Sequence, residues 1–165
     1  MKRVVLLLSF VVCCVMSLFA KSDVTLKSGS LSKLKTSKAK VYVVWDYSHA
    51  TLEGQDVKTF LKEKGKEWER DYKAELERAE ANFMERFNDK TKSVTITDKK
   101  SEADYTIVIE VKDFHYGSTG ASVLIGFGAG DAHMSALMNL YEKNMKQPFA
   151  VIDVDGVAGA GFGNE

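Results

Sequence analysis

The most regular hydrophobic pattern in the chain predicts helices in its middle third. Nine positions, spaced in repeating steps of four, four and three residues, form one stripe: Val57, Leu61, Gly65, Trp68, Tyr72, Leu76, Ala79, Phe83 and Phe87. A repeat of this period keeps the stripe on one side of a straight helix, and charged residues fill the positions between. Because Gly65 interrupts the stripe, we expect a short helix near 56–64 and a long one near 66–88. The aromatic side chains favour packing on a sheet, with a coiled-coil dimer as the alternative.

On either side of this segment the hydrophobic period changes to two. Apolar and polar residues alternate in four segments, each of which predicts a strand: 41–47, 94–97, 103–113 and 149–154. In 103–113 the predicted buried face carries Tyr105, Ile107, Ile109 and Val111. Residues 131–142 fit a strand or a helix, and the polar turn before 149–154 favours a strand that forms a hairpin with it. The order of elements predicts an α+β fold, with a mainly antiparallel sheet of four to five strands covered on one face by the long helix.

The first twenty residues predict a signal peptide. Lys2 and Arg3 precede an apolar run, and the small residue Ala20 stands before a polar stretch. The run is shorter than the roughly 20 residues that a membrane anchor needs. A lipoprotein site at Cys13 or Cys14 is the other alternative, and neither cysteine follows a small residue. We therefore expect an exported protein, in the periplasm or associated with the outer membrane or cell surface, without a transmembrane helix after cleavage.

Three regions follow from these patterns: the signal peptide at 1–20, a polar lead-in at 21–40 and a single α+β domain at 41–165. The lead-in is rich in Ser, Lys and Thr and has little periodicity, so it is expected to be a tether or an edge element. Both cysteines lie in the leader, so the exported domain must be held by a hydrophobic core and has no cysteine nucleophile. The 23 basic and 23 acidic residues balance, which argues against a nucleic-acid partner.

A glycine-rich segment at 126–130 is the most distinctive local motif. Gly126, Phe127, Gly128 and Gly130 invite comparison with a phosphate-binding loop, but the third glycine comes too early and no Gly-Lys-Ser/Thr follows. We expect these glycines to serve a tight turn, with at least one positive φ angle. Phe127 and Phe162 are each flanked by glycines, so they either form an exposed apolar patch or plug the ends of the core.

Two Asp-x-His triplets are the candidate metal ligands. Asp113 with His115, and Asp131 with His133, each place a carboxylate and an imidazole on one side of a strand. The alternation of the two strands puts the triplets on opposite faces of the sheet unless a bulge intervenes. We therefore predict polar strand ends rather than a joint metal site. The chain also lacks the Gly-x-Ser-x-Gly elbow of hydrolases, and no cofactor is expected.

The C-terminal half resembles a family of exported bacterial proteins. The Ala103-Asp104-Tyr105 strand, the Gly126–Gly130 turn and a hairpin that ends near Gly156 carry the resemblance to the domain of unknown function family 4410. The similarity covers residues 41–163 and implies an envelope protein or lipoprotein. It supplies no catalytic residues. The chain departs from that family in having no small residue before Cys13 or Cys14, as a lipoprotein site requires, and in ending at Glu165, where a terminal helix is expected in the family.

These observations predict a non-enzymatic envelope module that acts through contacts with an envelope protein partner. The alternative is an envelope enzyme that binds a metal or small ligand through the Asp113/His115 and Asp131/His133 pairs. The oligomeric state does not follow from the sequence.

Overall fold

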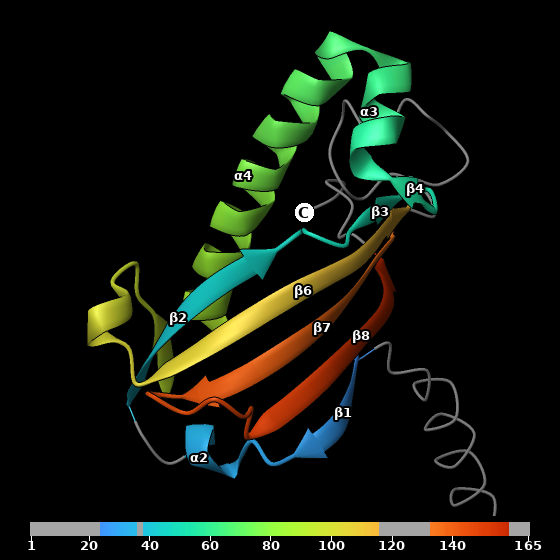
Figure 1. Cartoon of the computed structure of the whole chain (residues 1–165). Coiled ribbons are helices and arrows are strands. Elements are labelled where there is room, and N and C mark those ends of the chain that lie inside the picture. Colours follow the sequence, from blue (N-terminus) through green and yellow to red (C-terminus); the bar gives the residue numbers. More distant parts are fainter. Residues whose placement is uncertain (1–23, 36–37, 116–132, 159–165) are drawn as a thin grey trace, which may run out of the picture.

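The chain folds as an α+β structure with a mixed sheet and one long helix (Figure 1). The computed structural model describes residues 24–35, 38–115 and 133–158. Its strands are β1 (Val24–Gly29), β2 (Ala39–Asp46), β3 (Thr51–Leu52), β4 (Gln55–Asp56), β5 (Val94–Ile96), β6 (Tyr105–His115), β7 (His133–Glu142) and β8 (Ala150–Ala158). Its helices are α2 (Ser32–Lys35), α3 (Val57–Lys64), α4 (Lys66–Lys90) and the 3-10 turn η1 (Lys100–Glu102).

The sheet is mixed and eight-stranded, which corrects the expectation of a mainly antiparallel sheet of four to five strands. Its main path runs β1-β8-β7-β6-β2-β5, with the β3–β4 pair beside the end of β6. The predicted hairpin is confirmed by the antiparallel pair β7–β8, and β6 also pairs antiparallel with β7, whereas β2 pairs in parallel with both β5 and β6. The parallel pairs arise because α3 and α4 carry the chain back to the end of the sheet where β2 begins. Period-two patterns predict strands but not their direction.

The predicted helix break at Gly65 is confirmed. Asp56 caps α3, because its carboxylate accepts a hydrogen bond from the backbone N–H of Thr59 at 3.0 Å. Gly65 adopts φ +99° and ψ 176°, a conformation open to glycine and strained for other residues. The next residue begins α4, so the single stripe in the sequence is divided between two helices.

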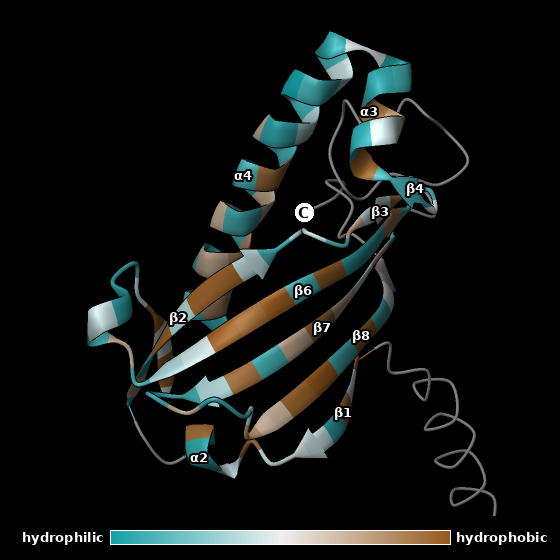
Figure 2. Ribbon diagram, viewed as in Figure 1, coloured by the Kyte–Doolittle hydropathy of each residue, from teal (hydrophilic) through white to brown (hydrophobic). Residues whose placement is uncertain are grey.

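The core lies between one face of the sheet and the helices. Its most deeply buried large side chains are Val41, Leu52 and Ile109. Ile107, Ile109 and Val111 of β6 are all buried, as the alternation predicted. On the helix side, Phe83 meets Trp45 edge to face with ring centroids 5.3 Å apart. Figure 2 shows the alternation of hydrophobic and hydrophilic residues along the strands and the mainly hydrophilic residues along α4.

The stripe of α4 is less buried than predicted. Trp68, Tyr72, Leu76 and Phe83 pack against the core, yet α4 contains no fully buried residue. Trp68 packs edge to face on Phe60 of α3, with ring centroids 6.0 Å apart. At this end α4 extends beyond the strands (Figure 1), and the contact of Trp68 with Phe60 joins α4 to α3.

The predicted lead-in contains two elements of the fold. β1 is the edge strand next to β8, and α2 follows it. Leu31 and Leu34 pack against the core, and Lys33 forms an ion pair with Glu142 at 2.6 Å. None of the helices in the described ranges combines the length and apolar character that crossing a bilayer requires.

Candidate functional site

A β-bulge in β6 brings the candidate histidines together. Val111 pairs with Ala136 and Asp113 with Ser135, so β6 has one residue more than β7 between these two pairs. The extra residue reverses the alternation, and the buried residue after the bulge is Phe114. The prediction that the two triplets lie on opposite faces assumed a continuous strand. It is wrong for His115 and His133, which pair directly across β6 and β7.

We call Glu53, Asp113, His115 and His133 the histidine cluster. The two imidazole rings are stacked, with centroids 4.7 Å apart and planes 25° apart. Nδ1 of His115 lies 3.0 Å from Oε2 of Glu53. The carboxylate of Asp113 accepts a hydrogen bond from the hydroxyl of Thr51. Asp131, the fourth candidate ligand, lies outside the described residues, and within them no group of three His, Cys, Asp or Glu is arranged to hold a metal ion.

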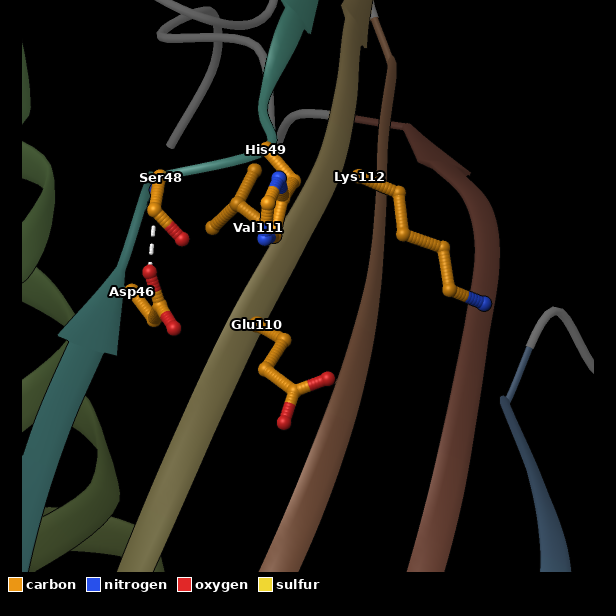
Figure 3. Close-up of a pocket in the computed structure, with 6 residues that line it drawn as sticks. All are labelled: Asp46, Ser48, His49, Glu110, Val111 and Lys112. Carbon is orange, nitrogen blue, oxygen red and sulfur yellow. Dashed lines mark hydrogen bonds between the residues drawn. The ribbon is translucent and has the colours of Figure 1, made fainter.

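A polar pocket lies beside this cluster, where β2 separates from β6. The last β2–β6 pair is Asp46 with Glu110, and the chain rejoins β6 at the pair of Thr51 with Asp113. The detour between them leaves an open pocket of about 420 Å³, shown in Figure 3. Its lining consists of Asp46, Ser48, His49, Glu110, Val111 and Lys112.

The charged groups of this pocket already have partners within the protein. Hydrogen bonds from the side chain and backbone of Ser48 hold the pKa of Asp46 below its ordinary value. Glu110 accepts a hydrogen bond from Nδ2 of Asn139 at 2.8 Å, and Nζ of Lys112 reaches Asp153 at 2.8 Å. The side chain and the backbone N–H of Ser48 both donate to the carboxylate of Asp46. The charged side chains of the pocket are therefore held in place by neighbours in the same chain.

The pocket opens onto the sheet face opposite the helices, which we call the open face. A row of three valines and one asparagine crosses four neighbouring strands at matched register, through Val44, Val108, Asn139 and Val151. Val44, Val108 and Val151 are partly exposed, and Asn139 is buried at 7% exposure. A second row contains Tyr42, Thr106 and Tyr141, all partly exposed. The open face therefore combines an apolar centre with the polar pocket at one end.

Sequence reasoning did not predict the pocket. Asp46 is the one charged residue in the predicted strand 41–47, and Ser48 and His49 directly follow that strand, so no motif distinguishes them. Their proximity to Glu110 depends on the parallel pairing of β2 with β6, which no local pattern indicates. The glycine motif of Gly126, Phe127, Gly128 and Gly130 lies outside the described residues, as does Phe162.

The fold belongs to the α+β class, with helices packed on one face of a mixed sheet. No protein-family model matches the chain, and no curated protein matches it. Among solved structures, the chain is similar to the PelC dodecamer from Paraburkholderia phytofirmans, at 14% identity and a TM-score of 0.37, over 79% of this chain and 77% of that one. It is also similar to a point variant of that dodecamer, at 13% identity and a TM-score of 0.34, over 82% of each chain. Likenesses at this level carry no information about function.

Proposed function

We propose that the protein is a non-enzymatic, exported module of the cell envelope that binds another envelope protein through the open face of its sheet. The observation that carries the proposal is the row in which Val44, Val108 and Val151 are partly exposed on β2, β6 and β8. Apolar groups gathered on one face and bordered by charged ones are characteristic of protein interaction sites.

The polar end of the open face supports the same proposal. Asp46, Glu110 and Lys112 lie beside the apolar row, and each is held by an intramolecular hydrogen bond or ion pair. Groups held in place before binding lose less side-chain entropy when a partner docks. A partner with an apolar centre and a polar rim would match this surface.

A matched pair of substitutions tests this proposal. Val108→Lys places a charge in the apolar row, whereas Ala74→Lys places the same charge at an exposed position of α4. Tagged proteins carrying each change are cross-linked in the envelope of the source cells and purified. We expect Val108→Lys to lose the partners that the unmodified protein retains, and Ala74→Lys to keep them.

Thermal melts separate lost binding from lost folding. If Val108→Lys fails to fold, Val108→Thr replaces one methyl group with a hydroxyl in a side chain of the same shape. It is expected to weaken partner capture, and its melt shows whether the fold is kept. Equal capture by all the folded variants would overturn the open face as the binding site.

The histidine cluster favours a second candidate function. His115 and His133 are stacked, and Glu53 contacts His115, so a metal- or small-ligand-binding enzyme that uses the Asp113/His115 and Asp131/His133 pairs stays a proposal. Metal analysis of the purified protein, followed by zinc titration of the unmodified protein and of His133→Ala, tests it. Stoichiometric zinc that disappears in His133→Ala would favour this function, and no bound zinc would count against a metal centre.

A further inference from the structure

One end of the sheet carries many lysines, and we call it the basic end. The segments that meet there are α2 with the start of β2, the end of α4 with the start of β5, η1, and the turn between β7 and β8 (Figure 1). They contain ten lysines: Lys33, Lys35, Lys38, Lys40, Lys90, Lys92, Lys99, Lys100, Lys143 and Lys146. They contain five carboxylates: Asp89, Asp98, Glu102, Asp104 and Glu142. Because the chain as a whole has equal numbers of basic and acidic residues, this end is positive and the rest of the chain is negative.

Contacts between these segments gather the lysines on one surface. Lys38 and Lys143 line the same open pocket of about 470 Å³, where β2 and β6 begin. The N–H of Lys143 donates to the carbonyl of Asp104 at 2.9 Å, and its Nζ donates to the carbonyl of Ser101 in η1 at 3.0 Å. The turn after β7 is thereby joined to η1, which is far from it in the sequence. The lysines of the basic end therefore act as one group.

The carboxylates leave much of this positive charge unpaired. Glu102 is shared by two lysines, because Nζ of Lys40 lies 2.7 Å and Nζ of Lys99 3.2 Å from its oxygens. Glu142 pairs with Lys33 at 2.6 Å. Within the ranges that the structure describes, the other lysines of this end form no ion pair: Lys35, Lys38, Lys90, Lys92, Lys100, Lys143 and Lys146. Like charges gathered in this way attract anions.

An exposed apolar residue stands among these lysines. Met145 is 59% exposed, more than any other large hydrophobic residue that the structure describes. It lies in the turn between β7 and β8, where Asn144 has a φ of +66° and the N–H of Met145 donates to the carbonyl of Glu142 at 3.0 Å. Lys143 and Lys146 lie close to it on either side in the sequence. The turn thus presents one apolar side chain between two cations.

We propose that the basic end binds the surface of a bilayer that contains anionic phospholipids. The lysines would contact the phosphate groups of the lipids, and several lysines near such a surface add their attractions. Met145 would enter the region between the headgroups and the acyl chains, where apolar side chains of peripheral proteins are buried. A soluble polyanion would match the lysines but would leave Met145 in water, so the exposed methionine favours the membrane. This proposal does not depend on the open face or on its partner.

Flotation of the purified protein with vesicles tests the proposal. Vesicles of phosphatidylcholine alone are compared with vesicles that also contain phosphatidylglycerol. We expect binding to the anionic vesicles only, and weaker binding as the salt concentration rises, because salt screens the attraction between lysines and phosphates. Equal binding to both kinds of vesicle, or binding to neither, would overturn the proposal.

A matched pair of double substitutions locates the contact. Lys38→Gln/Lys146→Gln removes two exposed charges of the basic end, whereas Lys62→Gln/Lys66→Gln removes two exposed charges where α3 meets α4. The first variant should bind anionic vesicles about 25-fold more weakly, as expected for two lysines close to an anionic surface. The second should bind like the unmodified protein. Equal losses in two variants that melt normally would show that the basic end is not the contact surface.

A fluorescent label at position 145 distinguishes a membrane from a soluble polyanion. Met145→Cys is made in a protein whose Cys13 and Cys14 are replaced by Ser, and Ala74→Cys on the exposed side of α4 is its matched control. Each protein carries a polarity-sensitive dye on its cysteine. Anionic vesicles should shift the emission of the dye at 145 to the blue and leave the dye at 74 unchanged. Binding to polyphosphate without a blue shift on vesicles would assign the basic end to a soluble polyanion and overturn the proposal.

Discussion

The hydroxyl of Tyr47 donates a hydrogen bond to the carboxylate of Glu80 at 2.8 Å, and this bond connects the end of β2 to the middle of α4. The contact is partly buried, and both partners come from elements whose association no local pattern determines. It fixes the position of the long helix along the sheet. Tyr47 also lies near Phe114, with ring centroids 6.3 Å apart, so the tyrosine contacts the core on one side and the helix on the other.

Removing this hydrogen bond should destabilise the fold. We expect Tyr47→Phe to lower the free energy of unfolding by about 1–2 kcal/mol, because it leaves a partly buried carboxylate without its donor. Chemical denaturation measures the change. Tyr42→Phe, on the open face, is the control and should change stability little. Equal changes in the free energy of unfolding for the two variants would show that the hydrogen bond between Tyr47 and Glu80 does not stabilise the fold.

Stability should fall at alkaline pH. Burial raises the pKa of Tyr72 to about 12, and burial together with Glu80 raises the pKa of Tyr47 above its ordinary value of 10. A pKa raised by folding contributes stability that is complete below the unfolded value and is lost as pH rises through the folded one. Melting temperatures should therefore be steady up to about pH 10 and decline towards pH 12. Tyr72→Phe should make that decline shallower, and an unchanged slope would contradict the assignment.

Gly65, which separates α3 from α4, should not tolerate substitution by another residue. Gly65→Ala is expected to cost about 1–3 kcal/mol, because φ +99° with ψ 176° lies in a region open almost only to glycine. A β-carbon at this position would meet no atom within 4 Å, so the cost is one of backbone conformation alone. Gly65→Asn should cost a similar amount, since asparagine adapts to left-handed helical turns but not to this region. If Gly65→Asn were as stable as the unmodified protein, the backbone at residue 65 would have to relax into a conformation that asparagine adopts without strain.

Trp68 should matter less than a buried tryptophan would. Truncating a large aromatic residue in a core costs about 3–5 kcal/mol, but Trp68 is only partly buried and packs on Phe60. We expect Trp68→Ala to cost about 2 kcal/mol, and Leu52→Ala, at a fully buried position, to cost more than Trp68→Ala. Urea denaturation of both variants gives the comparison. A larger loss for Trp68→Ala would mean that the contact between α3 and α4 controls the stability of the whole fold.

The sequence predicted the elements better than their arrangement. The break at Gly65, the β7–β8 hairpin and the core face of β6 followed from periodicity and turn residues, because each depends on neighbours along the chain. The parallel partners of β2 did not, since they depend on where α4 returns the chain. The bulge at Lys112 could not be predicted either, because an alternation pattern assumes a regular strand. The one unpaired residue of the bulge places His115 on the sheet face opposite to the predicted one.

The parallel pairing of β2 with β6 also has a consequence for how the chain acquires its structure. Lys40 and Asp104, 64 positions apart, bond to each other at the start of this pair, with the N–H of Lys40 and the N–H of Asp104 both acting as donors. Contacts this distant form slowly, because a long loop must close before they are made. A chain that emerges N-terminus first therefore presents β2 without its central neighbour until β6 has emerged. During that interval the apolar residues of β2 are available to other strands, so a chain whose synthesis has not yet reached β6 is expected to be prone to aggregation.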